Sequence, residues 1–271
     1  MSDLYTFIGG GNMGRALIGG LISNGQSKLS ICVADKTAAS RDACTKEFGV
    51  AVFESNILAT KKSNVIILAV KPKDIEEVSR DLNYRDLRDT LIISIAAGIT
   101  CAQLEKWLGK KTAIIRAMPN TPALIGLGIT GIFSNKNVNL LHKELATKIL
   151  GSVGKIEWLE EEWEIDAVTA VSGSGPAYFF LFYELLENAA VELGLDENLS
   201  RELVLSTAKG AIELALSSEK SSAQLRTDVT SPGGTTEKAL KSLKKNNLDK
   251  IIIEALIAAR DRSTELSSTQ K

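Results

Sequence analysis

Residues 7–17 read Phe7-Ile8-Gly9-Gly10-Gly11-Asn12-Met13-Gly14-Arg15-Ala16-Leu17, and this stretch decides the fold of the 271-residue chain. A β-rich run ends at Ile8 and an amphipathic helix follows, with three glycines between them in the order G-x-G-x-x-G. Gly9 permits a tight turn, Gly11 lets a pyrophosphate reach the backbone, and Gly14 lets the helix pack closely on the strand. In this strand-to-helix context the pattern predicts a dinucleotide-binding unit.

Short β-rich runs alternate with helical or loop segments from Leu4 to about Leu159. Several of these runs are apolar at consecutive positions, as strands covered on both faces should be. The predicted strands are Tyr5–Ile8, Leu29–Ala34, Val50–Phe53, Val65–Val70, Leu91–Ile95, Ala113–Ala117, Ile129–Phe133 and Lys155–Leu159. Such alternation predicts an α/β fold with a doubly wound, mainly parallel sheet.

Strand signals nearly disappear after Trp158, and the rest of the chain is predicted to be helical. The predicted helices are Glu162–Ala170, Pro176–Leu193, Leu199–Leu216, Pro232–Lys244 and Leu248–Leu266. We therefore expect two domains. Residues 1–160 would form a Rossmann-type dinucleotide-binding domain, and residues 161–271 an all-α domain for dimerisation and substrate binding.

The predicted helix from Pro176 is apolar almost all round, so a single packing face cannot cover it. It contains the run Ala177–Tyr183 and then further leucines and alanines. With only about a hundred residues in this half, covering such a helix takes a second subunit. The sequence therefore predicts an interlocked helical dimer.

A second glycine-rich stretch, residues 225–236, reads Leu225-Arg226-Thr227-Asp228-Val229-Thr230-Ser231-Pro232-Gly233-Gly234-Thr235-Thr236. Ser231 suits a helix N-cap and Pro232 suits the first helical position. The backbone N–H groups of residues 233–235 would then face outward and could receive a small anion. Thr236 adds a hydroxyl that can donate or accept a hydrogen bond. A Pro/Gly turn that merely starts a helix is the alternative.

The segment Ser172-Gly173-Ser174-Gly175-Pro176 repeats this logic before the apolar helix. It offers small residues, a serine that can cap the helix, and a proline in the first turn. Close backbone packing of one domain on the other is the alternative to a ligand role, because glycine permits either.

The second predicted strand ends at Ala34-Asp35-Lys36-Thr37. Asp35 could bind a ribose diol, which favours NAD, whereas Lys36, Thr37 and Arg41 could hold a 2′-phosphate, which favours NADP. The residues alone leave this choice open.

Composition excludes several classes of function. The chain is 44% hydrophobic and 24% charged, with a net charge of −1 and no block of like charges, so a nucleic-acid or anionic-membrane partner has no electrostatic support. Cys32, Cys44 and Cys101 follow no metal-ligand spacing and indicate free thiols in a reducing compartment. The apolar run Ala177–Leu186 is interrupted by Glu184 and is too short for a membrane span. We expect a cytoplasmic protein without a metal.

Several of these segments together resemble pyrroline-5-carboxylate reductase, the last enzyme of proline synthesis. The resemblance covers the whole chain, in order and with compatible spacing. It rests on Phe7–Gly14, Ala69-Val70-Lys71-Pro72, Ala96-Ala97-Gly98, Arg116-Ala117-Met118-Pro119-Asn120-Thr121-Pro122, Ser172–Tyr178 and Val229–Thr236. It implies that NADPH, or less readily NADH, delivers a hydride to a cyclic imino acid. It also implies a homodimer through the helical domain, and often a ring of five dimers.

The resemblance implies cofactor contacts from the first glycine stretch, the end of the second strand and the loops beyond it. These are Gly9, Gly10, Gly11, Asn12, Met13, Gly14, Asp35, Lys36, Asn56, Ala69, Val70, Lys71, Pro72, Ala97 and Asn120. Our preference for NADPH comes from this resemblance.

For the substrate, the resemblance implies that Thr236 hydrogen-bonds the imine nitrogen. The backbone of Gly234, Thr235 and Thr236 would hold the substrate carboxylate. Glu162 matches a glutamate near the family's substrate cleft. Glu219 matches one in its helical domain and is a candidate catalytic residue, with a solvated helix end as the alternative.

Asp228 departs from the family pattern, because relatives often carry an amide at this position. It is a candidate substrate contact, yet an extra carboxylate would weaken the binding of an anionic substrate.

The predicted chemistry needs little acid from the protein. A protonated imine is strongly electrophilic, so one hydroxyl at the nitrogen suffices, and Thr236 can supply it. The single histidine, His142, is predicted to lie on a surface helix of the first domain and to have no catalytic role.

Three other functions compete with this one. In 3-hydroxyacid dehydrogenases a lysine follows the interdomain glycine segment, whereas Pro176–Ala190 contains none. An imine reductase for another cyclic imine would share the fold, and a carboxylate on the best substrate would separate the two. A non-catalytic NAD-responsive regulator would need no polar group above the nicotinamide, and the two small-residue helix starts argue against it.

Overall fold

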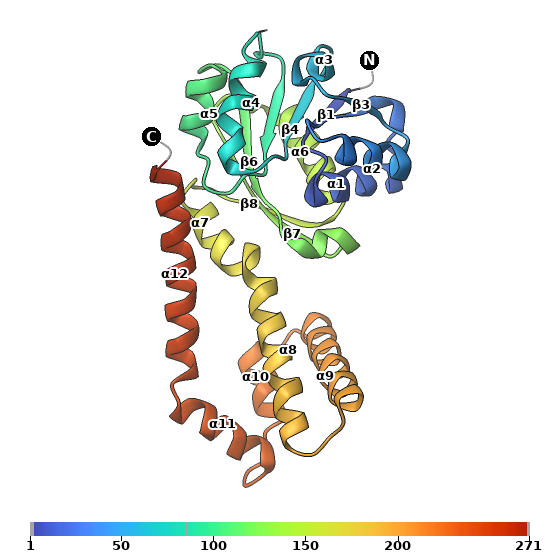
Figure 1. Ribbon diagram of the computed structural model, residues 1–271. Helices are drawn as coiled ribbons and strands as arrows, with labels where there is room; N and C mark the ends of the chain where they lie inside the picture. The colour runs from blue at the N-terminus through green and yellow to red at the C-terminus, as the bar shows by residue number, and fades with distance from the viewer. Residues whose placement is uncertain (1–2, 85, 270–271) are drawn as a thin grey trace. The chain divides into compact units, whose positions relative to one another are not determined.

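The computed structural model describes residues 3–84 and 86–269. Contacts divide the chain into two compact units (Figure 1). The first unit ends at Ser174 and takes up the chain again from Ala259, and the second unit is Gly175–Ala258.

In the first unit, the described residues form one eight-stranded sheet in the order β3-β2-β1-β4-β5-β6-β7-β8. The strands are β1 Tyr5–Ile8, β2 Ile31–Ala34, β3 Ala51–Phe53, β4 Val65–Leu68, β5 Leu91–Ser94, β6 Ala113–Met118, β7 Gly128–Ser134 and β8 Gly154–Trp158. Strands β6 and β7 pair antiparallel, and the other neighbours pair in parallel. The predicted strands and the doubly wound, mainly parallel sheet are confirmed.

Helices cover both faces of this sheet, which explains why its central strands carry apolar residues on both faces, as in Val65–Leu68 of β4. On one face α1 Asn12–Ser23, α2 Ala38–Phe48 and α6 Leu140–Gly151 bury side chains against alternate strand residues such as Phe7 and Ile67. On the other face α3 Asn56–Thr60, α4 Ile75–Leu82 and α5 Cys101–Leu108 pack against the intervening residues, such as Ile8 and Ile66. Short 3-10 segments span Lys28–Ser30, Pro72–Asp74 and Thr121–Ile125.

The remainder of the chain is helical, as predicted. It comprises α7 Glu164–Val168, a π-helical segment Thr169–Gly173, α8 Gly175–Glu192, α9 Glu197–Ser217, α10 Ser222–Asp228, α11 Thr235–Lys245 and α12 Leu248–Thr269. Helix α10 was not predicted. Within residues 3–84 and 86–269, none of the helices has both the length and the apolarity needed to cross a membrane.

The segment Ser172–Pro176 leads into α8 as expected, with Pro176 in the first turn, but Ser172 is not the cap. The Ser172 hydroxyl donates to the carbonyl of Val168, 3.0 Å away, and caps nothing. A Cβ at Gly173 would lie 2.6 Å from the Met118 Cε atom, so this glycine packs closely against the last residue of β6. Both residues belong to the first unit, so this contact leaves the choice between domain packing and a ligand role open.

Helix α8 leaves most of its aromatic and aliphatic side chains exposed within one chain. Phe180 is 65% exposed, and Phe179, Leu181, Leu185 and Leu186 are each between 53% and 56% exposed. A helix of this kind is covered in solution by another surface. The exposed apolar face of α8 therefore agrees with the prediction that another copy of the chain covers this helix.

Candidate active site

The glycine turn between β1 and α1 is shaped to receive an anion. Gly9 has a φ of +105°, and a Cβ there would lie 2.5 Å from the carbonyl oxygen of Ala69. A Cβ at Gly14 would lie 2.5 Å from the carbonyl oxygen of Gly9. No heavy atom lies within 4 Å of the position that a Cβ on Gly11 would take. Gly11 is the N-cap residue of α1, and no side chain caps this helix start. The residues present therefore fit the pyrophosphate of a dinucleotide at the start of α1.

Asp35 braces this turn from the end of β2. Its Oδ2 accepts from the N–H of Gly10 and its Oδ1 from the N–H of Thr37, each at 2.8 Å. Asp35 therefore braces the turn, and each of its oxygens keeps a lone pair for a further donor such as a ribose hydroxyl.

Two basic side chains lie beside Asp35. Arg41 donates from Nη1 to the carbonyl oxygen of Asp35 at 2.8 Å and lies 3.6 Å from the Glu54 carboxylate. The Lys36 Nζ atom is 3.5 Å from Asp74, and its side chain is 78% exposed. These pairs are loose and partly solvated, so the two cations can turn toward another anion at small cost.

The other predicted cofactor residues follow strands of the same sheet. Asn56 begins α3, Ala69–Pro72 follow β4, Ala97 follows β5 and Asn120 follows β6. Because β1 to β6 are parallel, these loops lie along one edge of the sheet, the edge where open α/β sheets bind ligands. Two of these side chains also form hydrogen bonds with other residues of the chain. Asn56 donates to Asp81 at 3.3 Å, and the buried Asn120 accepts from the N–H of Ile129 at 3.0 Å.

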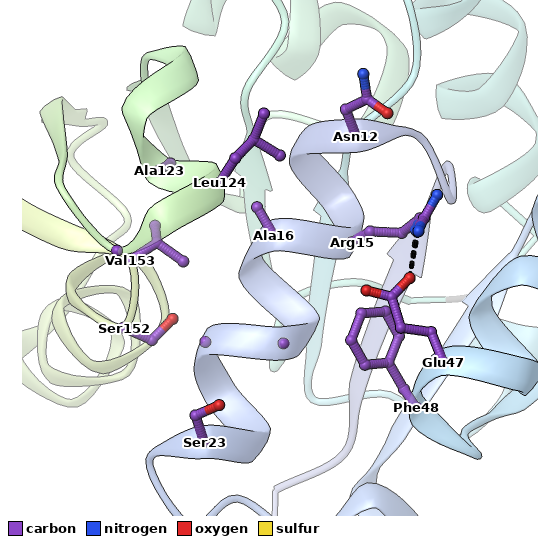
Figure 2. A pocket seen from close by; sticks show the side chains of 13 residues that line it. Asn12, Arg15, Ala16, Ser23, Glu47, Phe48, Ala123, Leu124, Ser152 and Val153 are labelled. Atoms are coloured by element: carbon purple, nitrogen blue, oxygen red, sulfur yellow. Dashed lines mark hydrogen bonds and ion pairs between the residues drawn. The ribbon is translucent and has the colours of Figure 1, made fainter. Parts of the chain in front are cut away.

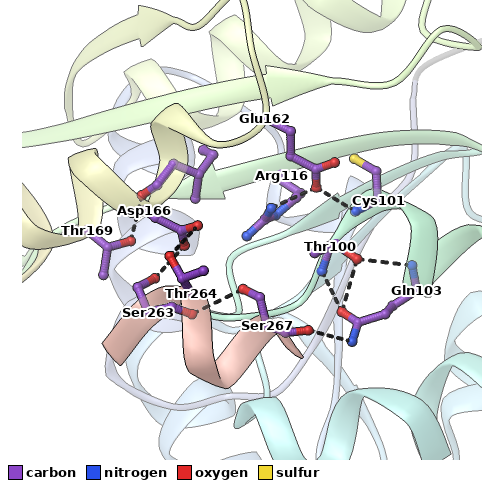
Figure 3. Close-up of polar contacts among 11 residues, drawn as sticks. Thr100, Cys101, Gln103, Arg116, Glu162, Asp166, Thr169, Ser263, Thr264 and Ser267 are labelled. Atoms are coloured by element: carbon purple, nitrogen blue, oxygen red, sulfur yellow. Dashed lines mark hydrogen bonds and ion pairs between the residues drawn. The ribbon is translucent and has the colours of Figure 1, made fainter. Parts of the chain in front are cut away.

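A buried ion pair links three segments of this edge (Figure 3). Arg116 on β6 is 4% exposed and donates from Nη1 to Glu162 Oε1 at 2.7 Å. The N–H of Cys101, at the start of α5, donates to the same oxygen at 2.7 Å. Burial raises the pKa of the Cys101 thiol, and the Glu162 charge raises it further, so the thiol stays neutral. The sequence reasoning missed Arg116 as a site residue.

Helix α12 joins the same polar network through its last turns (Figure 3). Asp166 on α7 accepts from the Ser263 hydroxyl at 2.6 Å and from the Thr264 hydroxyl at 3.3 Å. Gln103 on α5 donates to the carbonyl of Ser267 at 3.1 Å. These bonds fix the C-terminal turns of α12 to the first unit.

A hollow of about 380 Å³ lies along α1, between α2 and the 3-10 segment after β6 (Figure 2). It is lined by Asn12, Ala16, Phe48, Leu124 and others, and an Arg15–Glu47 ion pair crosses one side. Of the glycine-turn residues only Asn12 lines it, so this hollow is distinct from the cradle over Gly11.

In the second unit, the Ser231 prediction is wrong. Helix α11 begins at Thr235, with Gly234 as its N-cap. The Gly234 N–H donates to the Ser231 carbonyl at 3.0 Å, and Gly233 has a φ of +73°. Proline followed by a glycine of positive φ is the signature of a type II turn, and this turn occupies the place of the expected first helical residues.

The turn also changes which N–H groups are free. The Gly233 N–H, expected to face outward, donates to Glu237 Oε2 at 2.9 Å. Thr235 and Thr236 are now the first residues of α11, whose leading N–H groups have no intrahelical acceptor. Within the described part of the chain, the Thr236 hydroxyl has no hydrogen-bond partner.

Asp228 is the last residue of α10, and its Oδ2 lies 2.8 Å from the Nζ atom of Lys220. The negative charge of Asp228, which was expected to oppose an anionic substrate, is therefore balanced by a lysine. Glu219 lies exposed in the bend between α9 and α10.

His142 lies at the edge of the sheet opposite the glycine turn. It is the third residue of α6, which follows the antiparallel strand β7. Burial lowers its pKa, and the opposing charge is Asp89, which stands before β5. This position supports the expectation that His142 takes no part in the chemistry.

Comparison with known proteins decides the family. Residues 5–98 match the family described as NADP oxidoreductase, coenzyme F420-dependent, and residues 162–266 match the pyrroline-5-carboxylate reductase dimerisation family. A pyrroline-5-carboxylate reductase of Pseudomonas aeruginosa is 46% identical over 261 residues, which is 96% of each chain. The chain belongs to the pyrroline-5-carboxylate reductase family. One from Haemophilus influenzae is 40% identical over 98% of each chain.

Solved pyrroline-5-carboxylate reductases share the whole fold. The Coxiella burnetii structure superposes with a TM-score of 0.92 at 43% identity, covering 98% of this chain and 99% of that one. A Plasmodium falciparum pyrroline carboxylate reductase, solved with NADP bound, gives 0.88 at 34% identity over 98% of each chain. The resemblance read from the motifs is confirmed, as are an NAD(P)-dependent oxidoreductase and self-association through the helical domain.

Proposed function

We propose that this chain reduces 1-pyrroline-5-carboxylate to L-proline with NADPH, the last step of proline synthesis. The observation that carries this function is the 46% identity to a pyrroline-5-carboxylate reductase across both halves of the chain. The cradle at Gly11 and the unpartnered hydroxyl of Thr236 support it from the structure.

When bound, the nicotinamide cofactor supplies the hydride that the imine carbon receives. The chain's own groups bind and orient. The N–H groups at the start of α1 would hold the pyrophosphate, and those of Gly234, Thr235 and Thr236 the substrate carboxylate. The Thr236 hydroxyl would donate a hydrogen bond to the imine nitrogen and stabilise the electron pair that gathers there as the carbon accepts the hydride, and the nitrogen would then take its proton from water.

The substrate carboxylate provides a direct test of this assignment. We expect NADPH consumption with pyrroline-5-carboxylate to be much faster than with 1-pyrroline, which has the same ring without the carboxylate. Equal rates for both imines would point instead to a general cyclic-imine reductase. Glu162, Glu219 and Asp228 stay candidate residues of the substrate site.

We propose NADPH over NADH because of the cations beside Asp35. The ion pairs of Lys36 and Arg41 are loose and partly exposed, so these side chains can meet a phosphate on the ribose 2′ position. Arg41→Ala should weaken NADPH binding about tenfold and leave NADH binding unchanged, because the lost bond is to the 2′-phosphate.

The dissociation constants can be measured from the fluorescence of the reduced nicotinamide. Lys46→Ala, an exposed cation near the other end of α2, is the matched control and should change neither constant. An equal loss for both cofactors would mean that Arg41 acts only through its bond to the Asp35 carbonyl.

The exposed face of α8 supports a dimer, and the family resemblance extends the proposal to a ring of five dimers. A monomer in sedimentation at micromolar concentration would contradict the dimer. The three cysteines are free thiols, which fits the cytoplasm as the place where the chain acts.

A further inference from the structure

The side chain of Glu237 ties the Ser231 turn to the helix that follows it. Glu237 is the third residue of α11, and its Oε2 accepts from the N–H of Gly233 at 2.9 Å. In an ordinary capping box a glutamate at this position reaches back to the N–H of the N-cap. Here the N–H of the N-cap, Gly234, is already used within the turn, so the carboxylate reaches one residue further back.

Lys241 holds the other oxygen of the same carboxylate. Its Nζ atom lies 2.9 Å from Glu237 Oε1, one helical turn away. The lysine and then the Gly233 N–H keep the pKa of Glu237 below its ordinary value, so the carboxylate stays charged. Lys241 also balances a negative charge that would otherwise oppose an anion at the start of α11.

The turn needs such a tie because it contains two adjacent glycines. Gly233 and Gly234 are the residues with the most conformational freedom to lose, and Gly233 is exposed. The other end of the segment is fixed by the Lys220–Asp228 pair, at 2.8 Å. A carboxylate–lysine pair thus lies at each end of residues 228–237.

We propose that Glu237 is a positioning residue of the substrate site: by holding the Gly233 N–H it keeps the Ser231–Gly234 turn in the form that presents the N–H groups of Thr235 and Thr236 to the substrate carboxylate. This inference rests on the proposed reduction of pyrroline-5-carboxylate. Glu237 touches neither substrate nor cofactor in this account, because it acts through the backbone of Gly233.

Two variants with the same charge separate positioning from electrostatics. Glu237→Gln and Glu237→Ala both remove the negative charge, but only glutamine keeps an acceptor within reach of the Gly233 N–H. We expect the KM for pyrroline-5-carboxylate to be about tenfold higher in Glu237→Ala than in Glu237→Gln. The kcat values of the two variants should agree within about twofold, since Thr236 keeps its hydroxyl.

Two further measurements exclude a general effect of losing a helix-start glutamate. The dissociation constant for NADPH should be the same in both variants, because the cofactor cradle is in the first unit. Glu77→Ala removes an exposed glutamate from the same third position of α4 and should leave the KM unchanged.

The Glu237 experiment distinguishes a failure of this inference from a failure of the proposed function. If the unaltered chain forms no proline, the function itself fails. If it does, and the alanine and glutamine variants have the same KM, Glu237 does not position the turn. A rise in KM accompanied by an equal loss of NADPH affinity would show a general loosening of the fold and would also overturn the proposal.

Discussion

Thr236→Ala is expected to lower kcat/KM for pyrroline-5-carboxylate by about one to three orders of magnitude, or about 1.4–4 kcal/mol of transition-state stabilisation. Thr236 is the second residue of α11, and its hydroxyl has no partner within the described residues, so it is free to bond the imine nitrogen. The nitrogen becomes more basic as the carbon accepts the hydride, and the hydroxyl bond is therefore stronger in the transition state than in the ground state. Steady-state kinetics with both substrates varied measure the effect.

The controls for this variant keep or move the hydroxyl. Thr236→Ser should recover most of the lost rate, because serine retains the donor. Thr227→Ala removes an exposed threonine hydroxyl from α10, where it bonds the Ala223 carbonyl, and should have little effect. Turnover of Thr236→Ala close to that of the unaltered chain, with folding intact, would remove Thr236 from the mechanism.

Glu162→Ala is expected to lower the free energy of unfolding by about 3 kcal/mol, because it leaves the Arg116 guanidinium buried without its carboxylate. The value is at the low end for buried pairs, since the Glu162 side chain is 30% exposed while that of Arg116 is 5% exposed. The variant also frees the N–H of Cys101 at the start of α5. Denaturation by urea, with the slope compared between variants, gives the change.

Glu161→Ala is the matched control, since Glu161 is the exposed neighbour on the same segment and should cost less than about 0.5 kcal/mol. A change of less than about 1 kcal/mol for Glu162→Ala would mean that water replaces the carboxylate at Arg116.

The sheet could be predicted from the sequence because its rules are local. Apolar runs such as Val65–Leu68 and the spacing of Gly9, Gly11 and Gly14 carry their own structural consequences. The eight predicted strands lie within two residues of the observed ones. The apolar surface of α8 likewise followed from composition alone.

The Ser231 turn could not be decided locally, because two rules compete for the same residues. Ser-Pro suits an N-cap and first helical residue, while Pro-Gly suits a type II turn. The bond from Gly233 to Glu237 and the φ of Gly233 favour the turn. Glu237 follows directly after residues 225–236, and the bond from its carboxylate to the Gly233 N–H decides between the two rules.

Helix α10 was not predicted, although the sequence at its N-terminus carries a helix-start signal. Ser221 and Gln224 form a capping box, with both hydrogen bonds present in the structure. Two ion pairs, Arg116–Glu162 and Lys220–Asp228, could not be predicted from local sequence patterns. Their members meet only through the fold, so no local pattern could reveal that Arg116 is buried or that the charge of Asp228 is balanced.

The central claim is tested most directly by identifying the product. The purified chain, incubated with NADPH and pyrroline-5-carboxylate, should form L-proline in one-to-one ratio with the NADPH consumed, measured by chromatography alongside nicotinamide absorbance. Absence of proline at millimolar substrate, with the cofactor bound, would contradict the account.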